Sequence, residues 1–470
     1  MSWSIASLAG GTAALLAAVL TGQAPRSAVA VERSIAALVT AAEAKGSRVG
    51  VFAKELDGGR VLAAHRQEEL FAPASNQKLV VAAAVLSELG AGHRFTTDFA
   101  LRDGVLIVGA GGDPNWRSDG EHDPRTLLAG VARRLAAARV EAVRSIEVDA
   151  RGFVGPDRPA SWPRDQLHLD YCAPSSGLLL DGATWSVELR GAADGAPAGA
   201  RLVAPWTGYR IEGVLRCTND RKQGGRYKIA ERDGVLALEG NFWSRSEARV
   251  ARGACADPTG VFLRGLRSAL DDAGILVHPD APRTSLELPG ISTPLAPALV
   301  RALRDSSNVD AEQLLRALGA ARGDASFAGS LAALRDALAR SCPDGLPEGL
   351  VLADGSGLSR ADRCTPAVLV EVLCATAAHA DAELVLAALP RAGIDGTLEK
   401  RFLGSGLEGR VRAKTGTIAG ASTLSGFLAR QDGRIVAFSI LCDTSGNRRD
   451  AIDPRRLQEQ IVAALDGARG

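Results

Sequence analysis

The sequence has almost no surplus of charge, since 55 Lys and Arg against 54 Asp and Glu leave a net charge of +1. Such a chain has no broad electrostatic field that would attract nucleic acid or an anionic membrane surface. Its six histidines lack H-x-x-x-H spacing, and no Cys-x-x-Cys pair accompanies them. A metal site is therefore not expected, and nothing in the sequence calls for another cofactor. Selectivity for a ligand must come from a local site.

Long apolar runs are also lacking beyond residue 30, where no stretch approaches the ~20 apolar residues of a membrane span. Near the start, Ile5–Leu20 is largely apolar, and Ala28-Val29-Ala30 offers the small-x-small pattern of a cleavage site. These features predict a signal peptide over residues 1–30 and a mature chain, exported to the periplasm or cell envelope, that starts at Val31. No Lys or Arg precedes the apolar stretch. Two alternatives therefore stay open: a retained anchor, which would give weak membrane association, and a segment that is no signal.

The cysteines do not form a recognisable framework. Export would permit disulfides among the seven cysteines, but an odd number leaves at least one unpaired within the chain. Their wide spacing favours incidental cross-links or buried thiols over a disulfide scaffold, and it does not predict a connectivity.

Lysine is scarce, with seven lysines against 48 arginines. A guanidinium stays protonated in proteins, whereas an amine that is buried or close to another cation can lose its proton. Of the two residue types, only Lys can therefore act as a catalytic base. Positions that keep Lys are candidates for chemistry that Arg cannot perform.

The length of 470 residues and the 46% hydrophobic content predict a globular protein of two or three domains. Short strands separated by Gly, Pro and Asp predict a strand-rich insertion over residues 96–289, with a nested subdomain near 186–247. The flanking parts, residues 31–95 and 290–470, are expected to join into one α/β domain in which helices flank a sheet. In these parts we expect helices over 34–44, 78–89, 297–304, 309–318, 327–340 and 454–465, and strands over 48–55, 60–66, 410–415, 423–429 and 434–441.

Ser75-Asn76-Gln77-Lys78 places a hydroxyl and an amine three residues apart at the start of a predicted helix. Side chains at i and i+3 meet on one helix face, so Lys78 can take the proton of Ser75 if desolvation or another cation favours the neutral amine. Among the seven lysines, only Lys78 follows a serine at this spacing. On its own, the pattern also fits a capped helix with a surface lysine.

Two further segments carry polar side chains that suit a site. Lys414-Thr415-Gly416-Thr417 falls in a predicted strand, where the ammonium and the hydroxyls suit a carboxylate and Gly416 lets a ligand backbone approach. Ser306-Ser307-Asn308 precedes a predicted helix, with Ser306 as a candidate proton relay and Asn308 as a candidate amide for the base and the substrate carbonyl. Alone, the first also fits a turn after a strand and the second an ordinary N-cap.

Together the three segments occur in the order S-x-x-K, S-x-N, K-T-G, the signature of serine β-lactamases and penicillin-binding proteins. The chain resembles penicillin-binding D-Ala-D-Ala carboxypeptidases and endopeptidases of the penicillin-binding protein 4 type, peptidase family S13. The long segment between Ser75 and Ser306 fits the extra domains that this family carries there, whereas β-lactamases have a far shorter one. The resemblance implies a serine β-lactamase/transpeptidase-like domain interrupted by the insertion. Further matches are Pro73-Ala74-Ser75-Asn76, Gly111-Gly112-Asp113-Pro114, Asp354-Gly355-Ser356-Gly357-Leu358-Ser359 and Gly393-Ile394-Asp395-Gly396-Thr397-Leu398.

The resemblance also implies roles in a serine-type D-Ala-D-Ala carboxypeptidase that forms an acyl-enzyme on peptidoglycan stem peptides. Lys78 would activate Ser75, and Ser306 would pass a proton to the departing D-Ala. Lys414, Thr415 and Thr417 would hold the terminal carboxylate beside Gly416, while the N–H groups of Ser75 and Thr417 would form the oxyanion hole. β-Lactam antibiotics would acylate the same serine.

One departure from the family concerns the stretch Trp162–Leu167, where paired acids are common and one is thought to contact the amine of a diamino acid. Only Asp165 remains there, beside Gln166. Three alternatives stay open: a β-lactamase, a D,D-endopeptidase that uses the same site on a longer substrate, and a catalytically silent wall-binding protein. The long insertion argues against the first and the retained lysines against the last.

Overall fold

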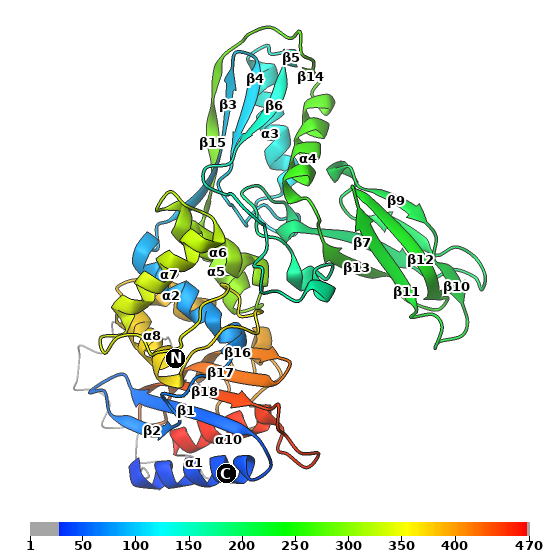
Figure 1. Cartoon of the computed structure of the whole chain (residues 1–470). Coiled ribbons are helices and arrows are strands. Elements are labelled where there is room, and N and C mark those ends of the chain that lie inside the picture. The colour runs from blue at the N-terminus through cyan, green and yellow to red at the C-terminus, as the bar shows by residue number, and fades with distance from the viewer. Residues whose placement is uncertain (1–27, 468–470) are drawn as a thin grey trace. The chain divides into compact units, whose positions relative to one another are not determined.

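The computed structural model describes residues 28–467, so nearly all of the predicted signal peptide lies outside the described residues. Contacts between residues divide the chain into two units. Within the described residues, the first unit comprises residues 28–92, 296–307 and 328–467, and the second comprises His93–Leu295 and Asn308–Phe327. Figure 1 shows the elements of both units in the order of the chain.

The first unit is built on a five-stranded antiparallel sheet with the order β16-β17-β18-β1-β2. β1 and β18 join the two ends of the chain, since Arg48 lies opposite Asp443 at one end of their ladder. The hairpin from β1 to β2 turns through Gly58 and Gly59, whose φ values of 69° and 64° are rare for residues with a Cβ. The strands are β1 (Arg48–Glu55), β2 (Val61–His65), β16 (Val411–Ile418), β17 (Ala421–Ala429) and β18 (Ile435–Asp443).

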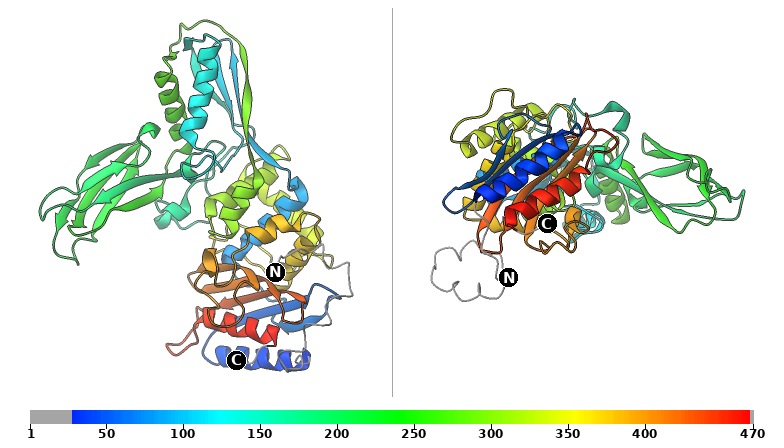
Figure 2. Two further views of the ribbon diagram at one scale, coloured as in Figure 1. Left: turned by 180° about the vertical axis from the view of Figure 1, so that it is seen from behind. Right: turned by 90° about the horizontal axis from the view of Figure 1, so that it is seen from below.

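Helices cover both faces of this sheet (Figures 1 and 2). α1 and α10 pack side by side against one face, whereas α8 lies against the other and carries α2. Buried apolar side chains from α1, α10 and the strands form the core between them. The helices wholly or mostly in this unit are α1 (Ala28–Glu43), α2 (Gln77–Leu89), α5 (Leu295–Leu303), α7 (Phe327–Ser341), α8 (Pro366–Ala378), α9 (Ala382–Ala388) and α10 (Pro454–Asp466). All helices and strands predicted for the flanking parts of the chain are present.

The second unit contains several small sheets, and it also contains two helices, α3 and α4, that were not predicted from the sequence. α3 (Pro124–Ala137) packs against α4 (Pro258–Asp272) beside a sheet with the order β15-β3-β4-β6. Each helix begins at an Asp-Pro pair, where Asp123 or Asp257 accepts a hydrogen bond from a backbone N–H of the first turn. That pair is an N-cap signal, so the strand-rich description was incomplete. The strands around them are β3 (Arg94–Arg102), β4 (Val105–Gly109), β5 (Ala142–Val143), β6 (Ser145–Asp149), β14 (Leu276–Val277) and β15 (Leu286–Pro294).

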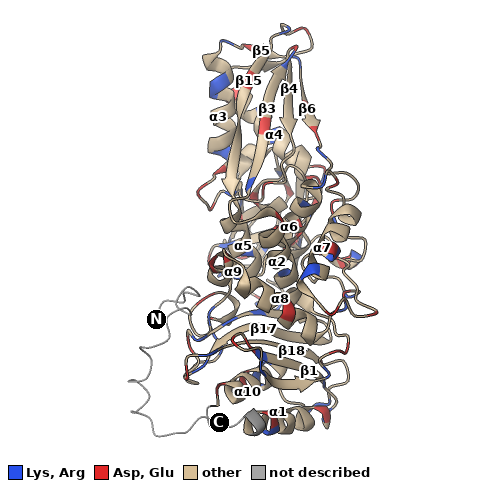
Figure 3. Cartoon of the chain, turned by 90° about the vertical axis from the view of Figure 1, so that its left-hand side faces the viewer, with Lys and Arg blue, Asp and Glu red and all other residues tan. Residues whose placement is uncertain are grey.

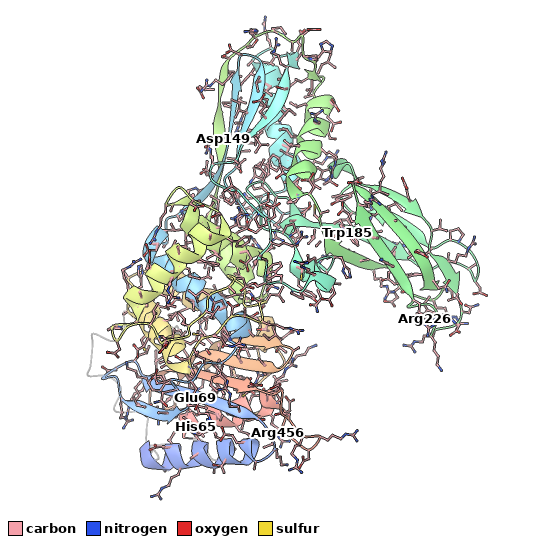
Figure 4. The ribbon with its side chains drawn as sticks, viewed as in Figure 1. His65, Glu69, Asp149, Trp185, Arg226 and Arg456 are labelled. Atoms are coloured by element: carbon pink, nitrogen blue, oxygen red, sulfur yellow. The ribbon has the colours of Figure 1, made fainter. Side chains whose placement is uncertain are left out.

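Two further sheets complete the second unit. One has the order β13-β7-β8, and in the other β12 pairs with β9, β10 and β11. Trp185 lies on β7, and Arg226 lies next to β11 at the far end of that second sheet (Figure 4). The strands are β7 (Thr184–Arg190), β8 (Gly199–Leu202), β9 (Arg210–Gly213), β10 (Arg216–Thr218), β11 (Tyr227–Arg232), β12 (Val235–Trp243) and β13 (Arg249–Ala254).

The helix α6 (Asn308–Ala320) belongs to the second unit by its contacts, although the sequence reading grouped all of residues 290–470 with the first. The reason is its polar face. Buried Asp310, Gln313 and Arg316 form hydrogen bonds with loops of the second unit. Because these loops lie far from α6 in the chain, no local sequence pattern predicts the bonds.

Basic and acidic residues are interspersed along the ribbon of each unit (Figure 3), and their numbers over the whole chain give a net charge of +1. Many form surface ion pairs, such as Arg48 with Glu69 at 3.1 Å, and His65 Nε2 lies 3.3 Å from Glu43 Oε1; Glu69 and His65 are labelled in Figure 4. The seven cysteines are free thiols, all buried except the half-buried Cys374. Among residues 28–467, no helix combines the length and the apolar character that a membrane span needs.

Candidate active site

Ser75 lies in the short 3₁₀ turn Ala74–Asn76, which leads directly into α2. The preceding Ala74 has a φ of 47°, a left-handed conformation that is uncommon for a residue with a Cβ. Ser75 is half-buried, whereas the side chain of Lys78 is only 1% exposed. Lys78 Nζ lies 3.0 Å from Ser75 Oγ. The hydroxyl and the amine are therefore within direct proton-transfer distance.

A backbone carbonyl holds Lys78 from another side, because Nζ also donates a hydrogen bond to Ser356 O at 2.6 Å. The loop around Ser356 is organised by buried Asp354, whose carboxylate accepts the N–H of Gly357 at 2.6 Å. Gly357 has a φ of 75°, and a Cβ there would lie 1.8 Å from Ala74 O. The sequence matched this loop to the family without giving it a role. The loop holds Lys78 through the backbone carbonyl of Ser356. Every residue has such a carbonyl, so the residue types in the loop do not predict this contact.

The segment Lys414–Thr417 lies on β16, one of the two edge strands of the five-stranded sheet. Within residues 28–467, β16 has a strand partner on one side only, apart from a single isolated bridge. On the outer side, Ala413 N–H donates to Pro390 O at 3.1 Å. Because backbone directions alternate along a strand, the backbone groups of Thr415 and Thr417 face the same outer side. An extended peptide can therefore pair with β16 at these residues.

Gly416 brings β16 close to the turn that carries Ser75. A Cβ at Gly416 would lie 2.2 Å from Thr423 Oγ1 and 2.9 Å from Ser75 N, so a larger residue would push the strand and the turn apart. Asn76 Nδ2 donates to Lys414 O at 2.8 Å and fixes the same approach. The N–H of Ser75 thus lies beside the backbone of β16, as a pair of oxyanion donors would require.

Lys414 is completely buried at the centre of the group. Its Nζ donates to Ser306 Oγ and to Thr415 O, both at 2.9 Å. Burial lowers the pKa of Lys414 well below the usual value of a lysine, the positive charge of Lys78 lowers it further, and the carboxylate of Asp305 acts in the opposite direction. A bound anion would reverse this shift, because it favours the charged form of the amine.

The S-x-N segment is shared between the two units. Ser306, in the first unit, has a φ of 62° and accepts its hydrogen bond from Lys414. Asn308, in the second unit, opens α6 and donates from Nδ2 to Tyr171 O at 2.9 Å. The two residues of one sequence motif therefore bond to different parts of the chain.

Asp165 also lies in the second unit, exposed in the short turn Arg164–Gln166. Its neighbour Gln166 is the residue that makes the local contact, because Tyr171 Oη donates to Gln166 Oε1 at 2.9 Å. Tyr171 in turn receives the hydrogen bond of Asn308 through its backbone. The sequence analysis named Gln166 beside Asp165 without giving it a role, and it did not name Tyr171, for which the proximity to Asp165 was the available signal.

Thr397 is another residue that the sequence reading left without a role. Its hydroxyl accepts a hydrogen bond from Thr415 Oγ1 at 2.8 Å. The turn before it is held by Asp395, which accepts the backbone N–H and the guanidinium of Arg391, each at 2.8 Å. The Gly393–Leu398 segment thus orients a hydroxyl of β16.

The first unit therefore gathers Ser75, Lys78, Ser306 and Lys414 around the edge of β16. This set provides a nucleophile with an adjacent base, a second cation for an anionic group and backbone N–H groups for a developing oxyanion. It suits acyl transfer through a covalent serine ester. Among residues 28–467, no three His, Cys, Asp or Glu side chains gather in a way that could hold a metal ion.

The fold and this group of side chains define a serine acyl-transfer enzyme of the penicillin-binding type. Residues 31–467 match the D-Ala-D-Ala carboxypeptidase 3 (S13) family, and the chain belongs to that family. It is a serine-type D-Ala-D-Ala carboxypeptidase, a hydrolase of the bacterial cell wall, as the sequence predicted.

Known relatives agree in sequence and in fold. The chain is 28% identical over 463 residues to the D-alanyl-D-alanine carboxypeptidase of Actinomadura sp. (strain R39), covering 90% of this chain and 81% of the relative. It is 25% identical over 416 residues to the D-alanyl-D-alanine carboxypeptidase DacB of Haemophilus influenzae, covering 84% and 85%. The crystal structure of penicillin binding protein 4 from Haemophilus influenzae superposes with a TM-score of 0.76 at 22% identity, covering 92% of this chain and 98% of the other. This likeness confirms the predicted fold class.

Proposed function

We propose that the chain removes the terminal D-Ala of peptidoglycan stem peptides through an acyl-enzyme at Ser75. The observation that carries the proposal is the 3.0 Å contact between Ser75 Oγ and the buried amine of Lys78. Neutral Lys78 accepts the serine proton, and its orientation is kept by the bond to Ser356 O. Oγ then forms a bond to the carbonyl carbon of the penultimate D-Ala.

The substrate is held by the edge of β16. Protonated Lys414 and the hydroxyls of Thr415 and Thr417 bind the terminal carboxylate, while the N–H groups of Ser75 and Thr417 stabilise the oxyanion. The position of Gly416 against Ser75 N supports this arrangement. Asn308 contributes its side-chain amide to the substrate backbone.

The leaving group needs a proton when the peptide C–N bond breaks. Ser306, which accepts a hydrogen bond from Lys414 at 2.9 Å, passes the proton that Lys78 took from Ser75 to the amine of the departing D-Ala. Water then attacks the ester, the C–O bond to Ser75 breaks, and the serine recovers its proton. A cross-linked peptide can follow the same steps, so the site also suits D,D-endopeptidase activity.

The two units would divide the work. We assign residues 31–95 and 290–470 to the catalytic domain, with the exception of Asn308–Phe327, whose contacts are with the second unit, and residues 96–289 to an inserted domain with a nested subdomain near 186–247. Asp165 and its neighbours in the insertion would contact the stem peptide. We further propose that the signal peptide of residues 1–30 directs the chain to the periplasm or cell envelope, and that a retained signal would add weak membrane association.

A time course with a fluorescent penicillin tests the proposal. The wild type should acquire a lasting label, and intact mass should show one adduct that is absent from Ser75→Ala. A colorimetric assay of D-Ala released from a stem peptide should show the same dependence on Ser75. The penicillin binding protein 4 of Haemophilus influenzae has been solved with a β-lactam bound, which supports the choice of probe.

The alternatives give different results in the same experiment. A β-lactamase would lose its label rapidly, and a silent wall-binding protein would never acquire one. An adduct that persists on Ser75→Ala would refute the assignment of the nucleophile.

A further inference from the structure

The helix α6 carries buried polar side chains that the proposed mechanism does not use. Asp310, Gln313 and Arg316 stand at every third position, and none is more than 1% exposed. Burying such groups costs free energy unless hydrogen bonds replace those to water. Apolar residues would serve plain packing at least as well, so the row calls for another explanation.

The outer two side chains of this row bind separate segments of the second unit. Arg117 Nη2 donates to Asp310 Oδ2 at 2.7 Å. Arg316 Nε donates to Ala325 O at 2.7 Å, and Nη1 donates to Ser175 O at 2.6 Å. The helix is thus attached at several points along its length.

Gln313 occupies the centre of the row and uses its whole amide. Nε2 donates to Gly112 O at 2.8 Å and to Ser176 O at 2.9 Å, while Oε1 accepts the hydroxyl of Ser175. A planar amide with both hydrogens and its oxygen bonded fixes the directions of all its partners. Gly112 is itself held, because its N–H donates to Gly177 O at 2.8 Å. The network therefore fixes the orientation of α6 about its own axis.

We infer that Gln313 is a positioning residue for Asn308. Asn308 lies five residues earlier on α6, about 7.5 Å along the axis, and bonds to Tyr171 O at 2.9 Å. Gln313 is bonded to Ser175 and Ser176, a few residues further along the same segment. The bonds of Asn308 and Gln313 to this segment fix the orientation of α6 about its axis and the position of its first turn along that axis. They therefore also fix the direction of the Asn308 side-chain amide. The inference rests on the proposed role of Asn308 toward the substrate.

A double-mutant cycle on the full-length enzyme tests the inference. The measured quantity is the second-order rate constant for acylation of Ser75 by a D-Ala-D-Ala peptide. Gln313→Leu should lower it about 10-fold in the wild-type background, since a displaced amide loses alignment with the substrate. In the Asn308→Ala background the same change should cost less than about 2-fold, because the group that it positions is gone.

Gln458→Leu is the matched control. Gln458 is a buried glutamine of α10, bonded to Ser422 at 3.3 Å and to Arg401 at 3.2 Å, and the mechanism does not use it. Its loss should lower the melting temperature, as Gln313→Leu does, but should leave the acylation rate per labelled site unchanged in both backgrounds. Counting active sites by penicillin label separates unfolded enzyme from misaligned enzyme.

A milder variant serves if Gln313→Leu does not fold. Ser175→Ala removes one donor to Gln313 and should slow acylation about 3-fold, again only when Asn308 is present. If the substitution at Gln313 or Ser175 slows acylation equally in both backgrounds, and Asn308→Ala by itself is slow, then Gln313 does not position Asn308, while the proposed role of Asn308 stands. Asn308→Ala that acylates like the wild type refutes the proposed role of Asn308, and the inference falls with it.

Discussion

Two buried basic side chains, Lys414 in the first unit and Arg316 in the second, show how the units use buried basic groups differently. Burial lowers the pKa of both side chains. Arg316 bonds to two carbonyls and lies 4.7 Å from the ring of Phe153, with the carboxylate of Asp157 at 3.8 Å. Lys414 bonds to one hydroxyl and one carbonyl, close to a second amine.

The difference follows the choice of residue type. A guanidinium stays charged wherever it is buried and serves as a fixed connector, whereas an amine can exchange its proton. In a chain that uses seven lysines and 48 arginines, both buried lysines lie in the candidate active site and the buried connector is Arg. Substitutions that exchange these residue types therefore test the comparison directly.

The largest effect is expected at Lys78. Lys78→Arg and Lys78→Ala should each slow acylation by about a thousandfold, because neither side chain can accept the serine proton. Stopped-flow labelling with a fluorescent penicillin measures the rate. Near-normal acylation of Lys78→Arg would show that another group is the base.

Lys414 should tolerate exchange better. Lys414→Arg keeps a positive charge for the carboxylate and should lose less activity than Lys414→Ala, for which we expect about a 30-fold fall in kcat/KM from the loss of about 2 kcal/mol of charged hydrogen bonding. Release of D-Ala from a stem peptide provides the measurement. If the two variants are equally impaired, charge is not what Lys414 contributes.

The converse exchange, Arg316→Lys, should affect stability rather than acid–base chemistry. An amine reaches fewer of the carbonyls around Arg316 and cannot stack on Phe153, so the free energy of unfolding should fall by about 2 kcal/mol. Denaturant titration measures it. A catalytic pH profile that shifts with this substitution would contradict the division between connector and exchangeable amine.

Binding of a terminal carboxylate should depend on pH through Lys414. The pKa of Lys414 is lowered in the empty site, and a bound carboxylate raises it. At a pH between the pKa of the empty site and the pKa of the complex, binding therefore takes up a proton, and the affinity falls as the pH rises. Calorimetry of Ser75→Ala with a D-Ala-D-Ala peptide, in buffers of different ionisation enthalpy, detects that proton. Lys414→Arg serves as the control and should show none, since a guanidinium stays protonated.

The smallest effect is expected at Asp165, which is exposed. Asp165→Asn should lower turnover of stem peptides with a free side-chain amine about 3-fold, the usual scale of an exposed ion pair, and should leave an acetylated Lys-D-Ala-D-Ala analogue unchanged. Competition between the two peptides gives the ratio. Equal effects on both would show that Asp165 does not read the stem peptide.

Much of the first unit could be predicted from the sequence because its signals are local. The spacing of Ser75 and Lys78 on one helix face and the turn at Gly58 and Gly59 depend on residues close together in the chain. The helices α3 and α4 were missed although both carry an Asp-Pro start, since short strands around them dominated the pattern.

The rest of the candidate site depends on backbone atoms and on distant contacts. Ser356 holds Lys78 through a carbonyl, so its side chain carries no signal. The partners of Gln313 are likewise carbonyls of Gly112 and Ser176, which lie far away in the sequence. Such contacts form only when the fold brings the loops together, and a single sequence does not encode them as a motif.

The pairing of β1 with β18 has a consequence for the order in which the protein can form. The nucleophile turn follows β1 near the start of the chain, while β16 and β18 lie near its end, so the ladder from Arg48 to Asp443 closes only after nearly the whole chain is available. Contacts of such high sequence separation form late and slowly. The second unit needs only His93–Leu295 and Asn308–Phe327, so all of its residues are available before β16, β17 and β18 are. An unfinished chain therefore contains Ser75 and Lys78 before it contains the strand edge that would present a peptide to them.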